Sequence, residues 1–174
     1  MKLFLYIVIL SFVFTACQKK GCQTIYAINY SPSAEKQDGS CIYYTKGNIS
    51  KIELSNFPKM DLNNEPWDAD SPADIFIRYT DSMDVVKYQT AELVDVNDVV
   101  SWIFPLPIGF NKNEGVVYFK VYEADDFTVE SMGIIPLDFD AYMHEANNEL
   151  NKYPDSIMVS QDEIELKIFV DWTV

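Results

Sequence analysis

The final stretch of the chain, residues 164–174, alternates between apolar and polar positions. Every second side chain, from Ile164 to Val174, is apolar, and the positions between them include Glu165, Lys167 and Asp171. Successive side chains of a β-strand point to opposite faces, so this period of two predicts a strand with one packed face and one wet face. Such a strand needs a sheet partner and a second layer to cover its apolar side.

Seven earlier runs show a similar though less regular strand pattern. They are residues 49–57, 73–80, 85–93, 99–106, 115–124, 131–138 and 155–160. A short polar link around Gln161 and Asp162 joins the last of these to the final strand and indicates a hairpin. Because a parallel sheet needs crossover helices, eight strands separated by turns predict an all-β fold, an antiparallel eight-stranded sandwich.

Residues 141–152 break the period of two. Tyr142, Ala146 and Leu150 follow one another at intervals of four, which places them on one face of a helix. We therefore expect one short surface helix between the strands at 131–138 and 155–160. His144, the only histidine in the sequence, lies off this stripe, and we interpret it as a solvated residue.

The N-terminus has the order of a secretion signal. Lys2 precedes an apolar run over residues 3–13, which is too short to serve as a spanning helix. The sequence FTAC at residues 14–17 resembles the lipobox of bacterial lipoproteins, with Phe where an aliphatic residue is usual. The alternative is an ordinary cleaved signal followed by an incidental cysteine.

The lipobox resemblance implies that residues 1–16 are removed as a signal peptide. Cys17 would then carry acyl chains such as palmitate and, within a short anchor segment at residues 17–21, attach the protein to a membrane. Gln18 does not match an acidic inner-membrane retention signal. The expected location is the bacterial cell envelope, at the outer membrane, with the periplasmic and external faces both open.

Cys22 and Cys41 remain after Cys17 is assigned. An even pair in an oxidising compartment indicates a disulfide, whereas a metal site would need more soft ligands than two. The surrounding segment resembles a small module of secreted proteins from Bacteroidetes-like bacteria, with the form GC, AxNY and DGSC. We interpret residues 22–48 as a Cys-bounded spacer module that separates the anchor from the sandwich at residues 49–174.

Charge and side-chain types exclude several functions. The sequence holds 13 Lys and Arg against 27 Asp and Glu, a formal net charge of −14, so it would repel a phosphate backbone, and nucleic acid is not an expected partner. A nucleophile would need a base, and His144 is the only histidine. The sequence also has no Gly-rich phosphate loop. We therefore expect a protein that is not an enzyme.

Two loops gather oxygen ligands next to strands. The first, residues 58–79, holds Asp61, Asp68, Asp70 and Asp74, and the second, residues 121–133, holds Glu123, Asp125, Asp126 and Glu130. Calcium takes six to eight oxygen ligands from carboxylates, carbonyls and water, which clustered acids on loops can supply. Acidic loops are also common for solubility, and Asp and Asn favour turns, so solvated turns are the alternative.

At these loops the chain resembles a C2 domain, the calcium- and phospholipid-binding β-sandwich. The segments PKMD at 58–61, ADIFIR at 73–78, VYEAD at 121–125 and ESMG at 130–133 are similar to the family's first and third calcium loops. Glu stands at positions 123 and 130 where the family has Asp, and Ile75 replaces its proline. The resemblance implies a C2-like fold over residues 49–174 and one set of metal ligands: Asp61, Asp74, Glu123, Asp125 and Glu130.

These observations give one functional hypothesis and one alternative. The hypothesis is an envelope lipoprotein, anchored to the membrane through Cys17, whose loops bind Ca²⁺ and through it an anionic lipid surface or an envelope protein. The alternative is a metal-free structural or protein-interaction module of the envelope.

Overall fold

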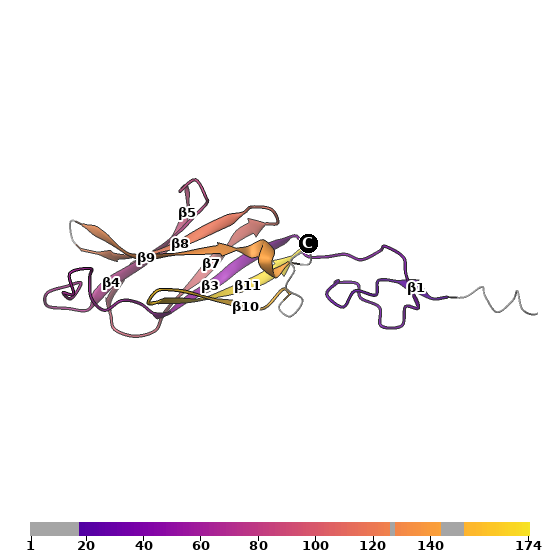
Figure 1. Ribbon diagram of the computed structural model, residues 1–174, viewed down its shortest axis with the longest axis horizontal. Coiled ribbons are helices and arrows are strands. Elements are labelled where there is room, and N and C mark those ends of the chain that lie inside the picture. Colours follow the sequence, from indigo (N-terminus) through magenta and orange to yellow (C-terminus); the bar gives the residue numbers. More distant parts are fainter. Residues whose placement is uncertain (1–17, 126–127, 144–151) are drawn as a thin grey trace, which may run out of the picture. The chain divides into compact units, whose positions relative to one another are not determined.

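The computed structural model describes residues 18–125, 128–143 and 152–174 (Figure 1). The chain divides into two compact units, with the boundary between Tyr44 and Thr45. Cys17, Asp126, His144 and most of the helix expected over residues 141–152 lie outside the described residues. Within the described part of the chain, no helix is long and apolar enough to cross a membrane.

The N-terminal unit is a stapled loop. Strands β1 (Lys20–Gly21) and β2 (Lys36–Gln37) form a short parallel pair. The disulfide predicted between Cys22 and Cys41 is confirmed, with 4.9 Å between the two Cα atoms. Asn29 reinforces it, because its side-chain nitrogen donates to the carbonyl of Ser40 and its oxygen accepts from the amide of Ile42.

The C-terminal unit consists of two antiparallel sheets. Within the described residues its strands are β3 (Lys46–Asn56), β4 (Ala73–Thr80), β5 (Val86–Gln89), β6 (Leu93–Val96), β7 (Val100–Asn111), β8 (Val116–Ala124), β9 (Val129–Asp138), β10 (Ser156–Gln161) and β11 (Ile164–Thr173). One sheet has the order β10-β11-β3-β7, and the other has the order β5-β4-β8-β9, with β6 also paired to β4. The predicted antiparallel sandwich is confirmed.

The described residues contain nine strands in this unit because the run at 85–93 divides. β5 ends at Gln89, and the next residue, Thr90, is buried. The amide of Thr90 donates to the carbonyl of Ile77, and its hydroxyl accepts from the amide of Ile77. The side chain and backbone of Thr90 thus replace one step of the sheet ladder, and β6 begins after this interruption at Leu93.

The core lies between the two sheets and follows the alternation of the sequence. On β11 the buried side chains are those of Ile164, Leu166, Ile168 and Val170. On β8 the inward positions are Val117, Phe119, Val121 and Glu123, all of them buried. The inward row of β8 therefore ends in a carboxylate at the loop end of the sandwich.

The opposite end is closed by aromatic rings. Phe110 stacks on Phe139 of the 3₁₀ helix η1 (Phe139–Tyr142), with ring centroids 3.8 Å apart, and meets the edge of Trp172. The ring of Phe110 lies over Gly47, its partner across β3 and β7, where no side chain intervenes. The absence of a side chain at Gly47 leaves the space that the ring of Phe110 fills.

The free edge of β7 contains an irregularity. Its register with β3 pairs Ile108 with Ile49 and Ile103 with Lys51, so residues 104–107 stand opposite a single β3 residue. Pro105 and Pro107 lie in this interruption and are exposed. Proline has no amide hydrogen to donate to a sheet ladder, so strands tolerate it mainly at edges and bulges.

Candidate functional site

The candidate site begins with the buried carboxylate of Glu123. Its strand, β8, places the residue opposite Ile75 on β4 and Glu130 on β9, and the side chain is only 1% exposed. Among the described residues, Oε1 of Glu123 has no hydrogen-bond partner. An ionised group buried without a partner is costly, so this position is unfavourable unless another group compensates the charge.

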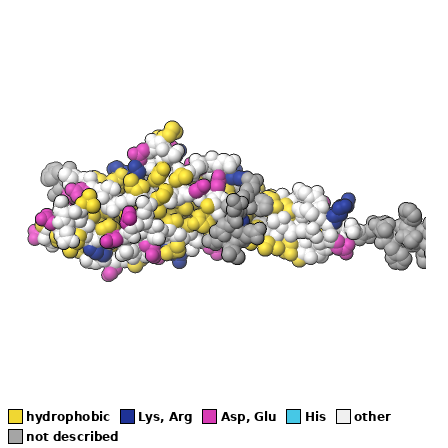
Figure 2. Space-filling view, viewed as in Figure 1, with side chains coloured by type: hydrophobic (Ala, Val, Ile, Leu, Met, Phe, Trp, Pro, Cys, Tyr) yellow, Lys and Arg dark blue, Asp and Glu magenta, His cyan; other side chains and the backbone are white. Residues whose placement is uncertain are grey.

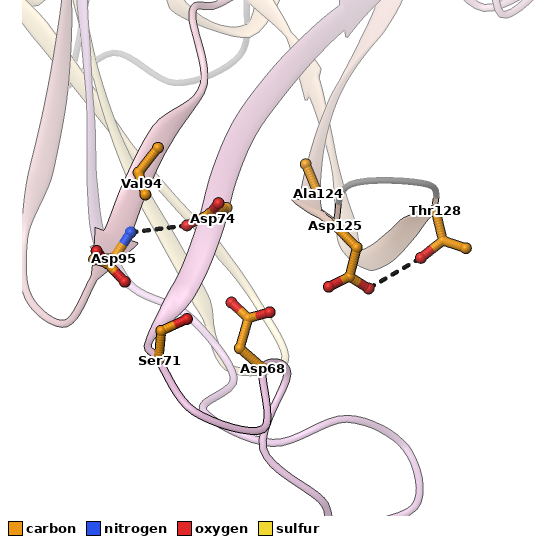
Figure 3. Close-up of a pocket in the computed structure, with 8 residues that line it drawn as sticks. All are labelled: Asp68, Ser71, Asp74, Val94, Asp95, Ala124, Asp125 and Thr128. Carbon is orange, nitrogen blue, oxygen red and sulfur yellow. Dashed lines mark hydrogen bonds between the residues drawn. The ribbon is translucent and has the colours of Figure 1, made fainter.

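Two further carboxylates approach Glu123 from loops. Asp125 follows β8 and is fixed by Thr128, whose carbonyl accepts from the Asp125 amide and whose hydroxyl donates to Oδ2 at 3.0 Å. Asp68 comes from the β3–β4 loop, and Figure 3 shows its carboxylate facing that of Asp125. Each of the three residues offers one oxygen, and these oxygens lie within 4.8 Å of one another. We call these residues the carboxylate cluster.

Burial and mutual repulsion change the acidity of the cluster. Burial, followed by the charge of Asp125, raises the pKa of Glu123 from 4.5 to about 7, against a lowering effect from the Asp74 backbone amide. Burial also raises the pKa of Asp68, with Asp125 as the next cause. The fold therefore holds together like charges that would each gain from a proton or a cation.

The donor set fits calcium. Calcium binds oxygen at about 2.3 to 2.6 Å, so two ligands on opposite sides of one ion lie about 4.6 to 5.2 Å apart. The spacing of the cluster oxygens is compatible with a shared ion at this distance. The unpartnered Oε1 of Glu123 is the atom that such an ion would satisfy.

The cluster borders a cavity of about 450 Å³, which we call the acidic pocket. Besides Asp68 and Asp125 it is lined by Ser71, Asp74, Val94, Asp95, Ala124 and Thr128 (Figure 3). Asp74 lies in its wall, but its Oδ1 accepts from the amide of Asp95 at 2.8 Å. This hydrogen bond turns one oxygen of Asp74 toward β6.

The five residues predicted as ligands occupy different positions. Glu123 and Asp125 belong to the cluster, and Asp74 lines the same pocket. Glu130 faces Glu123 across the ladder but is exposed and outside the cluster. Asp61 lines another cavity, and its carboxylate accepts from the amides of Asn63 and Glu65 and from the side chain of Asn63.

Asp68 is the cluster member that the predicted ligand set lacks. The sequence marks it only as one acid among several in a long loop. Its neighbour Trp67 packs against the core and donates its indole N–H to the carbonyl of Pro58, 2.9 Å away. This contact fixes the path by which the loop returns to the sandwich. The pair Trp67-Asp68, an aromatic residue that anchors the loop beside an acid, is therefore the sequence signal that could have identified Asp68 as a site residue.

Comparison with known proteins gives resemblances in fold alone. No protein-family profile matches the chain, and no curated protein does. Among solved structures, a C2 domain of 10% identity covers 75% of this chain and 100% of its own, with a TM-score of 0.47. A C2 domain of a plant extended synaptotagmin 1 has 15% identity, coverages of 76% and 98%, and a TM-score of 0.48. A C2 domain protein from Ramazzottius varieornatus has 12% identity, coverages of 74% and 89%, and a TM-score of 0.46.

Proposed function

We propose that this chain is a non-enzymatic lipoprotein of the bacterial envelope whose sandwich binds calcium at Asp68, Glu123 and Asp125. Through the bound ion it attaches to an anionic surface or to an anionic partner. The lipobox-like residues before Cys17 support the anchor, and the carboxylate cluster supports the ion site. The ion supplies positive charge at one end of a protein whose formal net charge is −14.

One observation carries the ion site: the buried, unpartnered Oε1 of Glu123 beside two other carboxylates. A solvated acidic loop would leave its carboxylates in water, where each is hydrated. Glu123 instead occupies the last inward position of β8, on the core side of the sheet. A cation that reaches the cluster replaces the lost hydration of Glu123 and removes the repulsion among the three acids.

Calcium titration of the chain from residue 17 onward, with Cys17→Ser, tests the proposal. Calorimetry should detect a single class of site, and binding should stabilise the fold by about 1.4 kcal/mol at a calcium concentration ten times Kd. Asp125→Asn should abolish this stabilisation. Asp61→Asn is the matched control, because asparagine can keep the same turn, and it should leave the calcium response unchanged. If Asp61→Asn removes the response and Asp125→Asn does not, the assigned site is wrong.

The metal-free alternative has its own supporting observation. With the pKa of Glu123 raised to about 7, a proton on this carboxyl can remove the buried charge of the cluster without any ion. The sandwich would then be a structural or interaction module whose loop end is most stable when protonated. Calcium that leaves the melting temperature unchanged at pH 8, where Glu123 is ionised, would favour this alternative.

A further inference from the structure

The loop end of the sandwich contains a second cavity, of about 490 Å³, that shares no lining residue with the acidic pocket. Three elements form it: the first part of the β3–β4 loop, β9 at Ser131 and Met132, and the β10–β11 hairpin at Asp162 and Glu163. Trp67 is part of its wall, and we call it the Trp67 cleft.

The loop that borders the cleft is closed on itself. An isolated bridge joins Met60 to Pro66, and Trp67 is tied to Pro58 by its indole hydrogen bond. Between these ties, the amide of Asp61 donates to the carbonyl of Glu65 at 2.8 Å, while the Asp61 side chain accepts three hydrogen bonds. The loop is thus a preformed arch whose carboxylate at Asp61 is already engaged.

The arch holds apolar side chains in water. Leu62, at its tip, is fully exposed, and Met60 is 46% exposed. Met132 is buried and Trp67 partly buried, and both line the cavity behind the arch. Single exposed apolar residues are ordinary, but here a leucine and a methionine on a closed loop adjoin a cavity that Trp67 and Met132 also line. The arrangement is suited to take up a further apolar side chain.

The charges around the cleft are mostly negative. Asp162 and Glu163 are exposed at the hairpin. Acidic side chains also lie at several places on the face of the molecule that Figure 2 shows. Lys59 is the one cationic residue among the described lining residues, and its ammonium group is engaged elsewhere. Its Nζ lies 3.4 Å from the centroid of the Phe57 ring and donates to the carbonyl of Asn97 at 2.7 Å. The rim therefore favours a ligand that brings positive charge.

We propose that the Trp67 cleft binds a segment of a partner protein in which a large apolar side chain stands next to lysine or arginine. The apolar side chain enters between Met60 and Trp67, and the basic side chains meet Asp162 and Glu163. No metal takes part in this binding, because the carboxylate of Asp61 is already engaged in hydrogen bonds that hold the arch. This binding is independent of the proposed calcium site.

An NMR titration in EDTA tests this proposal. The protein is the chain from residue 17 onward with Cys17→Ser, and the probe is the blocked pentapeptide Gly-Lys-Leu-Lys-Gly. We expect saturable shifts at the Leu62 and Glu163 amides and at the Trp67 indole. The peptide Gly-Glu-Leu-Glu-Gly should give none, and Leu62→Ser, at an exposed position, should abolish binding without changing the fold.

Two charge-reversal variants distinguish the effect of the acidic rim on binding from the effect of the protein's net charge. The double variant Asp162→Lys with Glu163→Lys should weaken binding of the lysine peptide at least fivefold. The matched control reverses two exposed acids outside the cleft, Asp155→Lys with Asp171→Lys, and should leave the affinity unchanged. Equal weakening by both pairs, shifts confined to the acidic pocket, or binding of phosphatidylglycerol vesicles through Leu62 in place of the peptide would overturn the proposal. Loss of the calcium response alone would not affect it.

Discussion

The buried carboxylate of Glu123 is unfavourable for stability, although the proposed ion site depends on it. The position is inward on β8, where Val117, Phe119 and Val121 precede it, so packing alone would favour a hydrophobic residue. A carboxylate at this position lowers the stability of the ion-free protein whenever it is ionised. We therefore expect Glu123 to dominate the response of the sandwich to pH.

The stability of the calcium-free protein should fall as pH rises from about 4.5 to 7. In this window the folded state retains the Glu123 proton, because burial raises its pKa to about 7, while the unfolded chain has lost it. Glu123→Gln should remove most of this decline and stabilise the protein at pH 8 by about 1 to 3 kcal/mol. Urea unfolding in EDTA at several pH values measures both effects.

Glu130→Gln is the control for this prediction. It removes the same charge from the cross-strand partner of Glu123, but at an exposed position. Its pH profile should match that of the unmodified protein. A flat profile for the unmodified protein, or the same change in slope with both variants, would contradict the assignment to Glu123.

At the scale of elements, the sequence predicted most strands because their signal is local. A period of two is set by the strand itself, and residues 73–80 and 164–173 formed strands where the pattern indicated. The run at 85–93 was misjudged because its division depends on Thr90 bonding to Ile77 on another strand. Nothing within the run signals this contact.

The same distinction explains the site. Glu123 and Asp125 were predicted because the segment where they lie, at the end of a recognisable strand, resembles a calcium loop of C2 domains. Asp68 depends on the path of the β3–β4 loop, which the contact of Trp67 with Pro58 decides. Asp61 followed its local preference instead, since Asp and Asn at this spacing form a side-chain-capped turn. Members of the carboxylate cluster that lie within loops are therefore harder to predict than members at strand ends.

The pairing of β3 with β7 gives a prediction about packing. A Cβ atom at Gly47 would lie 2.3 Å from the Phe110 ring, which is itself stacked on Phe139. Gly47→Ala should therefore displace the ring and destabilise the sandwich by about 1 to 3 kcal/mol, measured by thermal unfolding. At Gly109 the nearest atom to an added Cβ is Asn48 Oδ1 at 3.5 Å, so Gly109→Ala should change stability little. Equal effects would contradict this account.

At the scale of the whole molecule, the excess of acidic residues has to be reconciled with the proposed attachment to a membrane. With 27 acids against 13 basic residues, the chain gains nothing from an anionic membrane by charge alone. Acyl chains at Cys17 would supply attachment through the hydrophobic effect, at about 0.8 kcal/mol for each buried CH₂ group. A calcium ion bound at the carboxylate cluster would add a second, reversible contact.

Cys17→Ser should therefore release the protein from the membrane fraction of the bacterium that expresses it. It should also prevent incorporation of a labelled palmitate analogue, since the sulfur that is proposed to carry the acyl chain is absent. Cys41→Ser is the control: it breaks the disulfide with Cys22 but leaves Cys17 in place, so attachment and labelling should persist. Labelling that survives Cys17→Ser would refute the anchor.

The two prolines at the edge of β7 bear on how copies of such a protein coexist. Molecules held on one surface meet far more often than the same number in solution, and an open sheet edge is a template on which a neighbour's strand can dock. Pro105 and Pro107 lie where residues 104–107 leave the register with β3, and neither can donate a backbone hydrogen bond. A strand of a neighbouring molecule that began to pair with this edge would lose its hydrogen bonds at the two prolines. The free edge of β7 therefore resists the extension of the sheet from one molecule into the next.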